Sequence, residues 1–376
     1  MYRWSSSPAL LTALVASVSF AAAPSSPQPK SESGPFEVAT VAEGFEHPWG
    51  LALLPDGRML ITERAGRLRL IDKSGKASAP LKGVPKVAAG GQGGLLDLTL
   101  SPTFANDSLV YFSFSEPGQG GSGTAVARGR LGIDALENVQ VIWRQTPKVD
   151  SNLHFGSRIV FATNDTMFIT TGDRYNQRPK VQDLSTTIGK VIRLKIDGTV
   201  PEDNPFAKRE GALPEIWSYG HRNIQAAALH PETNALWTIE HGARGGDELN
   251  NPQGGKNYGW PVITYGIDYS GVKIGEGTEK QGMEQPVYYW DPVIAPSGAI
   301  FYTGDAFKDW QGDLLIGSMT PGGLVRLEMQ DGKVTKETRY LGELRERIRD
   351  VQQGADGSIY LITDSSKGKV LRLSPK

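Results

Sequence analysis

A histidine stands directly before an alternating apolar run in the segment SNLHFGSRIVF, residues 151–161. The chain has only five histidines, and imidazole is the side chain whose ordinary pKa lies closest to neutral pH. His154 is therefore a candidate general base, which would take a proton from a substrate hydroxyl. The alternative is a structural histidine at the entry of a strand, and the segment alone leaves both interpretations open.

Two arginine motifs offer permanent positive charge to an anionic ligand, or to negative charge that develops during a reaction. SYGHRNIQ contains Arg222 beside Asn223, and RERIRDV contains Arg345, Arg347 and Arg349. Alternate residues of a strand share a face, so we expect two or three guanidiniums of the second motif to point the same way, toward a polyanionic small molecule. The alternatives are a surface ion pair for Arg222 and a solvated strand edge for the cluster.

Two glycine-rich segments are candidate ligand loops. Gln92 lies in AAGGQGGLLDL, where glycines let the backbone approach a ligand closely, although a flexible hairpin explains the pattern equally well. EHGARGGDELNNPQGGKNYGW, residues 240–260, combines Asp247, Glu248 and Tyr258 with many glycines. Carboxylate and carbonyl oxygens suit a hard cation, and the irregular loop favours calcium over magnesium. A zinc-type site is not expected, because the chain has no cysteine and no histidine pair at ligand spacing.

Several other functions lack their sequence signatures. The chain contains no G-x-S-x-G elbow, no H-E-x-x-H motif and no Walker loop, and no dinucleotide fingerprint follows a strand and opens a helix. The formal net charge of the 376-residue chain is −1, which gives no electrostatic reason to expect a nucleic-acid partner. We therefore expect a small-molecule ligand.

The elements that must position these residues repeat along the chain. HPWGLALLPDGRMLITERAGRLRLID shows an alternating apolar run, a Pro-Asp-Gly turn and two further strands. Similar units begin at residues 93, 154, 222, 296 and 347, and no long amphipathic helix separates them. This repetition predicts an all-β fold, a six-bladed β-propeller with four-stranded antiparallel blades around a central channel. A stack of separate β-sandwiches is the competing fold.

The propeller places the candidate residues together. Ligands of propellers usually lie at the central channel, which the innermost strands and the loops that enter them line. His154, Arg222, Ser297, Arg347 and Arg349 all stand at the starts of units, so we expect them to meet there. FEVATVAEGF, residues 36–45, is expected to pair with the last blade and close the ring.

The first residues have a different composition. In 1–23, Arg3 precedes a short apolar run and three alanines, which is the layout of a secretory signal peptide; an uncleaved anchor is the alternative. Residues 24–35 are expected to be a flexible leader, and 36–376 a single propeller domain. This organisation predicts a periplasmic or secreted protein without stable membrane insertion after cleavage.

Taken together, seven motifs resemble the soluble aldose sugar dehydrogenases that use pyrroloquinoline quinone (PQQ), a family that includes the soluble glucose dehydrogenases. The motifs run in order from about residue 36 to the C-terminus: HPWGLALLPDG, GQGGLLD, HFGSRIVF, IWSYGHRNIQ, EHGARGGDELN, KNYGWP and RIRDV. The resemblance implies oxidation of the anomeric carbon of aldose sugars to lactones, with hydride transfer to PQQ beside calcium. Electrons then pass to an external acceptor.

The resemblance also implies roles for individual residues. His154 matches the catalytic base, and Arg222 matches the residue that stabilises charge on the quinone oxygen. Further cofactor contacts match Gln92, Asn223, Tyr269, Arg347 and Arg349. Calcium ligands match the backbone carbonyls of Gly242 and Ala243, and a second calcium site matches Glu248 and Tyr258.

Three positions depart from the family pattern. Thr320, in GSMT, stands where family members often carry a lysine beside the cofactor, so only Ser318 and Thr320 hydroxyls are available there. Ala243 replaces a proline of some relatives, which a backbone carbonyl ligand would tolerate. Leu153 replaces an acidic residue of some glucose-specific relatives, which favours the broader aldose branch. Two other functions stay open at this point: a calcium-dependent lactonase or esterase, and a non-catalytic recognition propeller.

Overall fold

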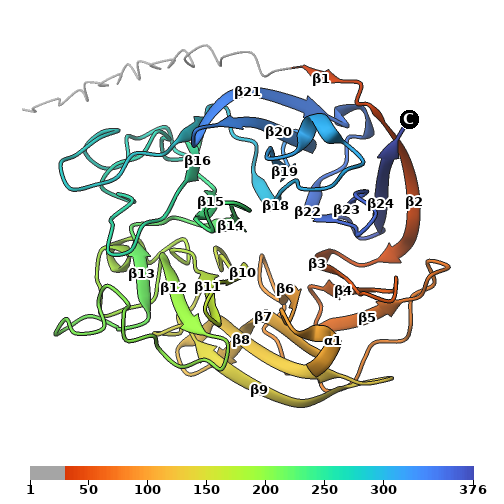
Figure 1. Ribbon diagram of the computed structural model, residues 1–376. Coiled ribbons are helices and arrows are strands. Elements are labelled where there is room, and N and C mark those ends of the chain that lie inside the picture. Colours follow the sequence, from red (N-terminus) through yellow and green to blue (C-terminus); the bar gives the residue numbers. More distant parts are fainter. Residues whose placement is uncertain (1–29) are drawn as a thin grey trace, which may run out of the picture.

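The computed structural model describes residues 30–376, which form a ring of six sheets around a central channel (Figure 1). The predicted all-β six-bladed propeller is confirmed. The first strand of each blade lies nearest the centre, where it contacts the first strands of the two neighbouring blades. The starts of the repeated units are therefore gathered around one axis, as the repeat predicts.

Blades 1 to 3 occupy the first half of the ring. Blade 1 has three strands, β3 (Pro48–Leu53), β4 (Met59–Glu63) and β5 (Arg67–Ile71). Blade 2 contains β6 (Leu95–Leu100), the short helix α1 (Phe104–Asp107), β7 (Leu109–Gly118), β8 (Gly121–Leu131) and β9 (Leu136–Arg144). Blade 3 contains β10 (Ile159–Ala162), β11 (Thr166–Thr170), the 3-10 helix η1 (Arg178–Val181), β12 (Lys190–Lys195) and β13 (Ile216–Tyr219).

Blades 4 to 6 complete the ring. Blade 4 contains β14 (Ile224–Leu229), β15 (Leu236–Glu240), β16 (Asp247–Asn250) and β17 (Tyr288–Trp290). Blade 5 contains β18 (Pro296–Phe301), η2 (Lys308–Trp310), β19 (Leu314–Ser318), β20 (Gly323–Gln330) and β21 (Lys333–Tyr340). After η3 (Gly342–Leu344), blade 6 contains β22 (Ile348–Gln353), β23 (Ile359–Thr363) and β24 (Gly368–Pro375).

The two ends of the described chain close the ring. β2 (Phe36–Phe45) pairs antiparallel with β24, from Phe36 opposite Pro375 to Phe45 opposite Gly368. β2 is thus the outermost strand of blade 6, although it precedes blade 1 in sequence (Figure 1). This pairing confirms the expectation for residues 36–45, and it satisfies backbone groups that would otherwise form an open sheet edge.

Two blades differ from the expected four strands. Blade 1 has three, because residues 72–94 after β5 carry Pro80, Pro85 and several glycines, which disfavour a ladder strand. Blade 5 has a fifth, β1 (Ser31–Glu32), which pairs in parallel with β21. The described end of the predicted leader thus lies against this blade. The predicted signal peptide, 1–23, lies outside the described residues. None of the helices within residues 30–376 has the length and apolarity that a membrane crossing requires.

The core consists of apolar clusters between neighbouring blades. Phe112 and Leu60 belong to the cluster between blades 1 and 2, and Met167 and Trp143 belong to the cluster between blades 2 and 3. Because each blade is covered on both faces, β4 is buried along its whole length rather than alternately. Burying such a side chain contributes about 1.5–3 kcal/mol, so the inter-blade clusters hold the channel residues in place.

Candidate active site

His154 lies in the loop between β9 and β10, at one mouth of the channel, and its side chain is buried. Its backbone nitrogen donates a 2.8 Å hydrogen bond to Gln92 Oε1, so the glycine-rich loop contacts the backbone of the histidine. The backbone φ of His154 is +49°, a left-handed conformation that costs a non-glycine residue about 1–3 kcal/mol. The fold therefore maintains an unfavourable backbone conformation at the candidate base.

A chain of three buried groups orients the imidazole. His154 Nδ1 lies 2.6 Å from Asp173 Oδ1, and Trp260 Nε1 donates a 2.8 Å hydrogen bond to Asp173 Oδ2. An ionised carboxylate only accepts hydrogen bonds, so the proton of the neutral imidazole belongs on Nδ1 and the lone pair on Nε2. This is the tautomer that a general base requires.

Burial controls the ionisation of this pair. Desolvation lowers the pKa of His154 below its ordinary value, although the hydrogen bond that His154 donates to Asp173 opposes that effect, and the positive charges of Arg222 and Arg174 lower it further. Burial alone would raise the pKa of Asp173, but the hydrogen bond and charge of His154 and the charge of Arg222 bring it below the usual range. At neutral pH the pair is thus a neutral imidazole on a carboxylate.

Arg222 is buried beside this pair. Its backbone nitrogen donates to Glu240 Oε2 at 2.5 Å, and its Nη1 donates to the carbonyls of His241 (2.9 Å) and Gly242. Its guanidinium lies 5.3 Å from the centroid of the Trp260 ring. Its Nε and Nη2 are buried without a hydrogen-bond partner among the described residues. Two fixed donors are therefore available to an anionic group.

Asn223 supports the loop that carries His154. Its Oδ1 accepts a 3.1 Å hydrogen bond from the backbone nitrogen of Gly156, two residues after the histidine. Asn223 is itself buried. The adjacent residues Arg222 and Asn223 thus have different roles in the site. Arg222 offers unpartnered donors to a ligand, and Asn223 holds the backbone of the loop that carries His154.

A cavity of about 210 Å³ lies at this mouth of the channel. Three arginines face it, Arg64, Arg347 and Arg349, and the Nε atoms of Arg64 and Arg349 are buried without a partner among the described residues. Asp364 is the carboxylate in the wall. The complete lining comprises Trp49, Arg64, Gln92, Gln225, His241, Ala295, Met319, Arg347, Arg349 and Asp364. The charge of this wall favours a ligand with more than one negative group.

The arginine cluster is arranged differently from the strand face that we expected. β22 begins only at Ile348, so Arg345 stands at the end of η3 and is exposed. Arg347 keeps a side chain that is 49% exposed, whereas Arg349 is buried and donates to Asp364 Oδ2 at 2.5 Å. Asp364 also lies 3.6 Å from Arg347, so part of the compensating negative charge comes from the protein. The pKa of Asp364 falls far below its usual range, because the charge and hydrogen bond of Arg349 outweigh the effect of burial.

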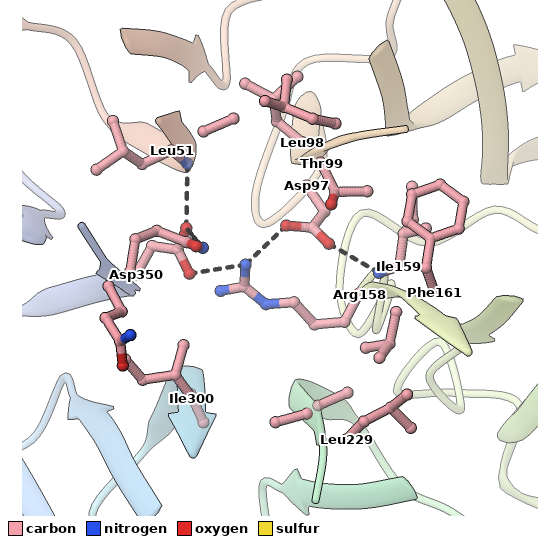
Figure 2. A pocket seen from close by; sticks show the side chains of 18 of the residues that line it. Leu51, Asp97, Leu98, Thr99, Arg158, Ile159, Phe161, Leu229, Ile300 and Asp350 are labelled. Atoms are coloured by element: carbon pink, nitrogen blue, oxygen red, sulfur yellow. Dashed lines mark hydrogen bonds and ion pairs between the residues drawn. The ribbon is translucent and has the colours of Figure 1, made fainter. Parts of the chain in front are cut away.

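A second charged layer lies in the channel, where Arg158 stands between Asp97 and Asp350 (Figure 2). Arg158 Nη1 lies 2.7 Å from Asp97 and 2.9 Å from Asp350, and its guanidinium stacks 4.2 Å from the Trp49 ring. Beyond it, a wider cavity of about 450 Å³ is lined mainly by apolar residues of the first strands. Arg158 lines this wider cavity and also donates to the carbonyls of Gln225 (2.7 Å) and Arg349 (3.1 Å), two residues of the 210 Å³ cavity, so the charged layer lies between the two cavities.

Four predicted cofactor contacts lie outside the lining of the 210 Å³ cavity, Asn223, Tyr269, Ser318 and Thr320, and the predicted catalytic residues His154 and Arg222 do not line it either. Ser318 Oγ donates to the carbonyls of Ile294 (2.8 Å) and Thr320 (3.2 Å), and the residue that faces the cavity is Met319. Thr320 is exposed. Tyr269 lies in the loop after β16, with 59% of its side chain exposed. The structure does not bring these hydroxyls to the arginines.

The predicted calcium ligands fall into two places. The Gly242 carbonyl accepts Arg222 Nη1, and Ala243 is buried in an apolar cluster with Trp260. Glu248 and Tyr258 share with Glu240 a space of about 10 Å³, room for one water-sized group. Burial and the charge of Glu240 raise the pKa of Glu248 well above its usual value. Among residues 30–376 no cluster of three or more acidic or histidine side chains has metal-site spacing.

Asp247, also noted in the sequence, has a structural role. Its Oδ1 accepts from the Gly242 nitrogen, and its Oδ2 accepts from the Ile294 and Ala295 nitrogens, all at 2.8 Å. The carboxylate therefore joins blades 4 and 5 through backbone amides.

Sequence reasoning missed the residues that follow the second strand in five of the six blades. Arg64 follows β4, Asp173 lies shortly after β11, His241 follows β15, Met319 follows β19 and Asp364 follows β23. In an antiparallel hairpin the end of the second strand lies beside the start of the first, so these residues share the mouth with the unit starts. The hairpin geometry was the signal that could have found them.

Comparisons with known proteins show the family of this chain. A family model described as glucose / sorbosone dehydrogenase matches residues 45–372. The chain is 48% identical over 345 residues to the aldose sugar dehydrogenase YliI of Escherichia coli (strain K12), across 90% of this chain and 93% of that protein.

Two solved structures have the same fold over nearly the whole chain. The soluble aldose sugar dehydrogenase of Escherichia coli in its apo-form superposes with a TM-score of 0.88 and 47% identity, over 91% of this chain and 100% of that one. The PQQ-bound aldose sugar dehydrogenase of Streptomyces coelicolor superposes with a TM-score of 0.76 and 27% identity, over 92% and 99%. This chain therefore belongs to the glucose/sorbosone dehydrogenase family.

Proposed function

We propose that this protein is a PQQ- and calcium-dependent aldose dehydrogenase that oxidises the anomeric carbon of sugars to lactones. The observation that carries the proposal is the position of a buried, neutral histidine with a free Nε2 beside a guanidinium with two unpartnered donors. That combination supplies a proton acceptor and a stabiliser of negative charge in one water-poor site. Family membership supports the same reaction and favours neither a hydrolase nor a recognition propeller.

The cavity above Arg158 suits PQQ, a planar molecule with three carboxylates. Arg64, Arg347 and Arg349 would hold these carboxylates, because charge-assisted bonds from guanidiniums are the strongest that the wall offers. PQQ bound there would supply the acceptor for the hydride from C1 of the sugar. Gln92 lies in the same wall and ties the cofactor site to the backbone of His154.

His154 and Arg222 have separate roles in the proposed reaction, proton transfer and charge stabilisation. His154 takes the proton of the anomeric hydroxyl on Nε2, while Asp173 holds Nδ1–H and stabilises the imidazolium that results. The free Nε and Nη2 of Arg222 stabilise negative charge that grows across the site. Trp260 contacts both sides of the site, because its ring lies against Arg222 and its nitrogen donates to Asp173. It therefore fixes the position of Arg222 relative to His154.

We propose calcium within residues 240–260. Glu248 and Glu240 face one small space, and two carboxylates there favour a divalent cation. Tyr258 lines the same space, but its hydroxyl already donates to the Asn251 carbonyl. At Gly242 the carbonyl is bonded to Arg222, so a cation there would have to displace the guanidinium. The pair around Glu248 is therefore the better-supported location.

The setting of the enzyme is also part of the proposal. A secretory signal in residues 1–23 would direct the protein to the periplasm or the exterior, where aldoses are accessible. Electrons from each turnover would pass to an external acceptor.

Dye reduction by the purified protein tests the function. Apo-protein is mixed with calcium, PQQ and an aldose panel, and each component is omitted in turn. We expect turnover only with all three, and we expect His154→Ala to abolish it while PQQ still binds. Lactone hydrolysis without PQQ, or failure of PQQ to bind, would overturn the proposal.

A further inference from the structure

Tyr175 is an aromatic residue beside the base that the proposed mechanism does not use. Its ring centroid lies 5.4 Å from that of His154, with the two planes at 80°. The side chain is 41% exposed, and its hydroxyl makes no hydrogen bond to the residues that the structure describes. An open aromatic face and a free phenol thus stand at the edge of the imidazole.

The backbone holds Tyr175 there from both sides. Its nitrogen donates a 2.7 Å hydrogen bond to Asp173 Oδ1, the same oxygen that binds His154. Tyr175 and Arg174 both have positive φ, +65° and +54°, which non-glycine residues rarely adopt. Two consecutive unfavourable conformations persist only when the surroundings impose them, and they are found preferentially at functional sites.

Arg174 provides the anchor for this conformation. Its guanidinium is fully buried, 3.7 Å from the Phe155 ring centroid, and it donates to the carbonyls of Leu153 (3.0 Å), Ser122 (2.8 Å) and Ser151. With Arg174 directed into the protein, the next side chain is left on the outer side, next to His154. The pair therefore presents one aromatic ring to the space in front of the base.

We infer that Tyr175 is a specificity-determining residue that packs against the ring of the aldose while His154 takes its anomeric proton. This inference rests on the proposed function and adds a substrate contact to it. A pyranose has an apolar face of C–H bonds and a rim of hydroxyls, which matches an aromatic ring that carries a hydrogen-bonding tip. The contact binds substrate and transition state alike, so it lowers KM and leaves kcat nearly unchanged.

The test compares three variants of the PQQ- and calcium-loaded enzyme with glucose, xylose and maltose as substrates. Tyr175→Ala should raise KM about tenfold, because an aromatic contact contributes up to about 1.5 kcal/mol, and should leave kcat within about twofold. Tyr175→Phe keeps the ring and should stay within about threefold of the wild-type KM. Tyr289→Ala is the matched control, since Tyr289 is 46% exposed on β17 and stacks on Tyr265.

The outcomes distinguish a direct contact between Tyr175 and the sugar from an indirect effect of Tyr175 on the base His154. The pH profile of kcat/KM and the Kd for PQQ should be the same in Tyr175→Ala and wild type. An unchanged KM in Tyr175→Ala, or a fall in kcat with a shifted pH profile, would overturn the inference. If the wild-type enzyme oxidises none of the sugars, the proposed function itself has failed, which is a different result from an active wild type with an indifferent Tyr175.

Discussion

The indole nitrogen of Trp260 donates a 2.8 Å hydrogen bond to Asp173 Oδ2. The other oxygen of the same carboxylate, Oδ1, lies 2.6 Å from His154 Nδ1. Trp260 comes from the long loop of blade 4, and both other residues belong to blade 3. The same indole ring lies against Arg222. One side chain from a neighbouring blade therefore sets the position of both the proton acceptor and the cation, so a change at either end of this chain should affect the chemical step.

Asp173→Asn should lower kcat by about 10³-fold or more, measured with PQQ and aldose at saturation. An asparagine whose oxygen accepts from Trp260 turns its amide donors toward His154 Nδ1. The imidazole must then accept at Nδ1 and carry its proton on Nε2, where it can no longer act as a base. Trp260→Phe is the milder comparison, because it removes one hydrogen bond but keeps the carboxylate. A kcat for Asp173→Asn within tenfold of wild type would contradict this assignment.

The pH dependence of kcat/KM should have an acid limb whose midpoint lies below pH 6.5. Burial lowers the pKa of His154, and this effect together with nearby arginines outweighs the carboxylate of Asp173. The active neutral imidazole therefore persists to a lower pH than a free histidine would, and activity falls about tenfold per unit below the pKa. An acid limb centred above pH 6.5 would show that the imidazole is not desolvated during turnover.

The repeat pattern predicted the fold, because six apolar units with Pro-Asp-Gly-type turns can bury their faces only against each other. It predicted that His154, Arg222 and Arg349 lie near one another, and the structure has each of them at, or a few residues before, the start of a first strand. It did not place Asp173 or Arg64, because alternation along one strand does not name the residues opposite it. The turn between the first two strands of a unit does imply a hairpin, and in that hairpin the residue after the second strand lies beside the start of the first.

The burial and the ion-pair partners of the arginines could not be predicted from the sequence either. The three arginines of RERIRDV look equivalent in the sequence. In the structure, Arg345 is exposed because it follows the end of η3 at Leu344, whereas Arg349 is buried and forms an ion pair with Asp364. The distance along the chain between Arg349 and Asp364 gave no hint of their 2.5 Å contact. A buried guanidinium requires a nearby anion, but the sequence alone did not say whether the anion was a ligand or an aspartate.

Replacing the two cavity arginines should separate cofactor binding from stability. Arg347→Gln should weaken PQQ binding about tenfold, yet change the free energy of unfolding by less than about 1 kcal/mol, because the Arg347 side chain is 49% exposed and lies 3.6 Å from Asp364. Arg349→Gln should weaken binding similarly and also destabilise the apo-protein by about 3 kcal/mol, because Asp364 loses its buried partner. PQQ titration and urea unfolding of the apo-proteins measure the two effects. Equal stability losses in both variants would contradict the different burial of the two arginines.

Calcium should raise the melting temperature of the apo-protein, since a ligand that binds only the folded state stabilises it by about 2.7 kcal/mol at 100 times its Kd. Glu248→Gln should remove most of this shift, because it takes one of two facing carboxylates out of the proposed site. Glu284→Gln is the matched control, because Glu284 is exposed and forms its ion pair with Lys256, 2.9 Å away.

Arg222→Gln should increase the calcium affinity of the apo-protein. Arg222 lines the same space as Glu248, so its removal eliminates the positive charge nearest to the cation and releases the Gly242 carbonyl to serve as a further oxygen ligand. Calorimetric titration of calcium into the apo-variants measures this directly. If the calcium affinity is unchanged in both Glu248→Gln and Arg222→Gln, the cation binds outside residues 240–260. Arg222 would then have no electrostatic effect on calcium binding.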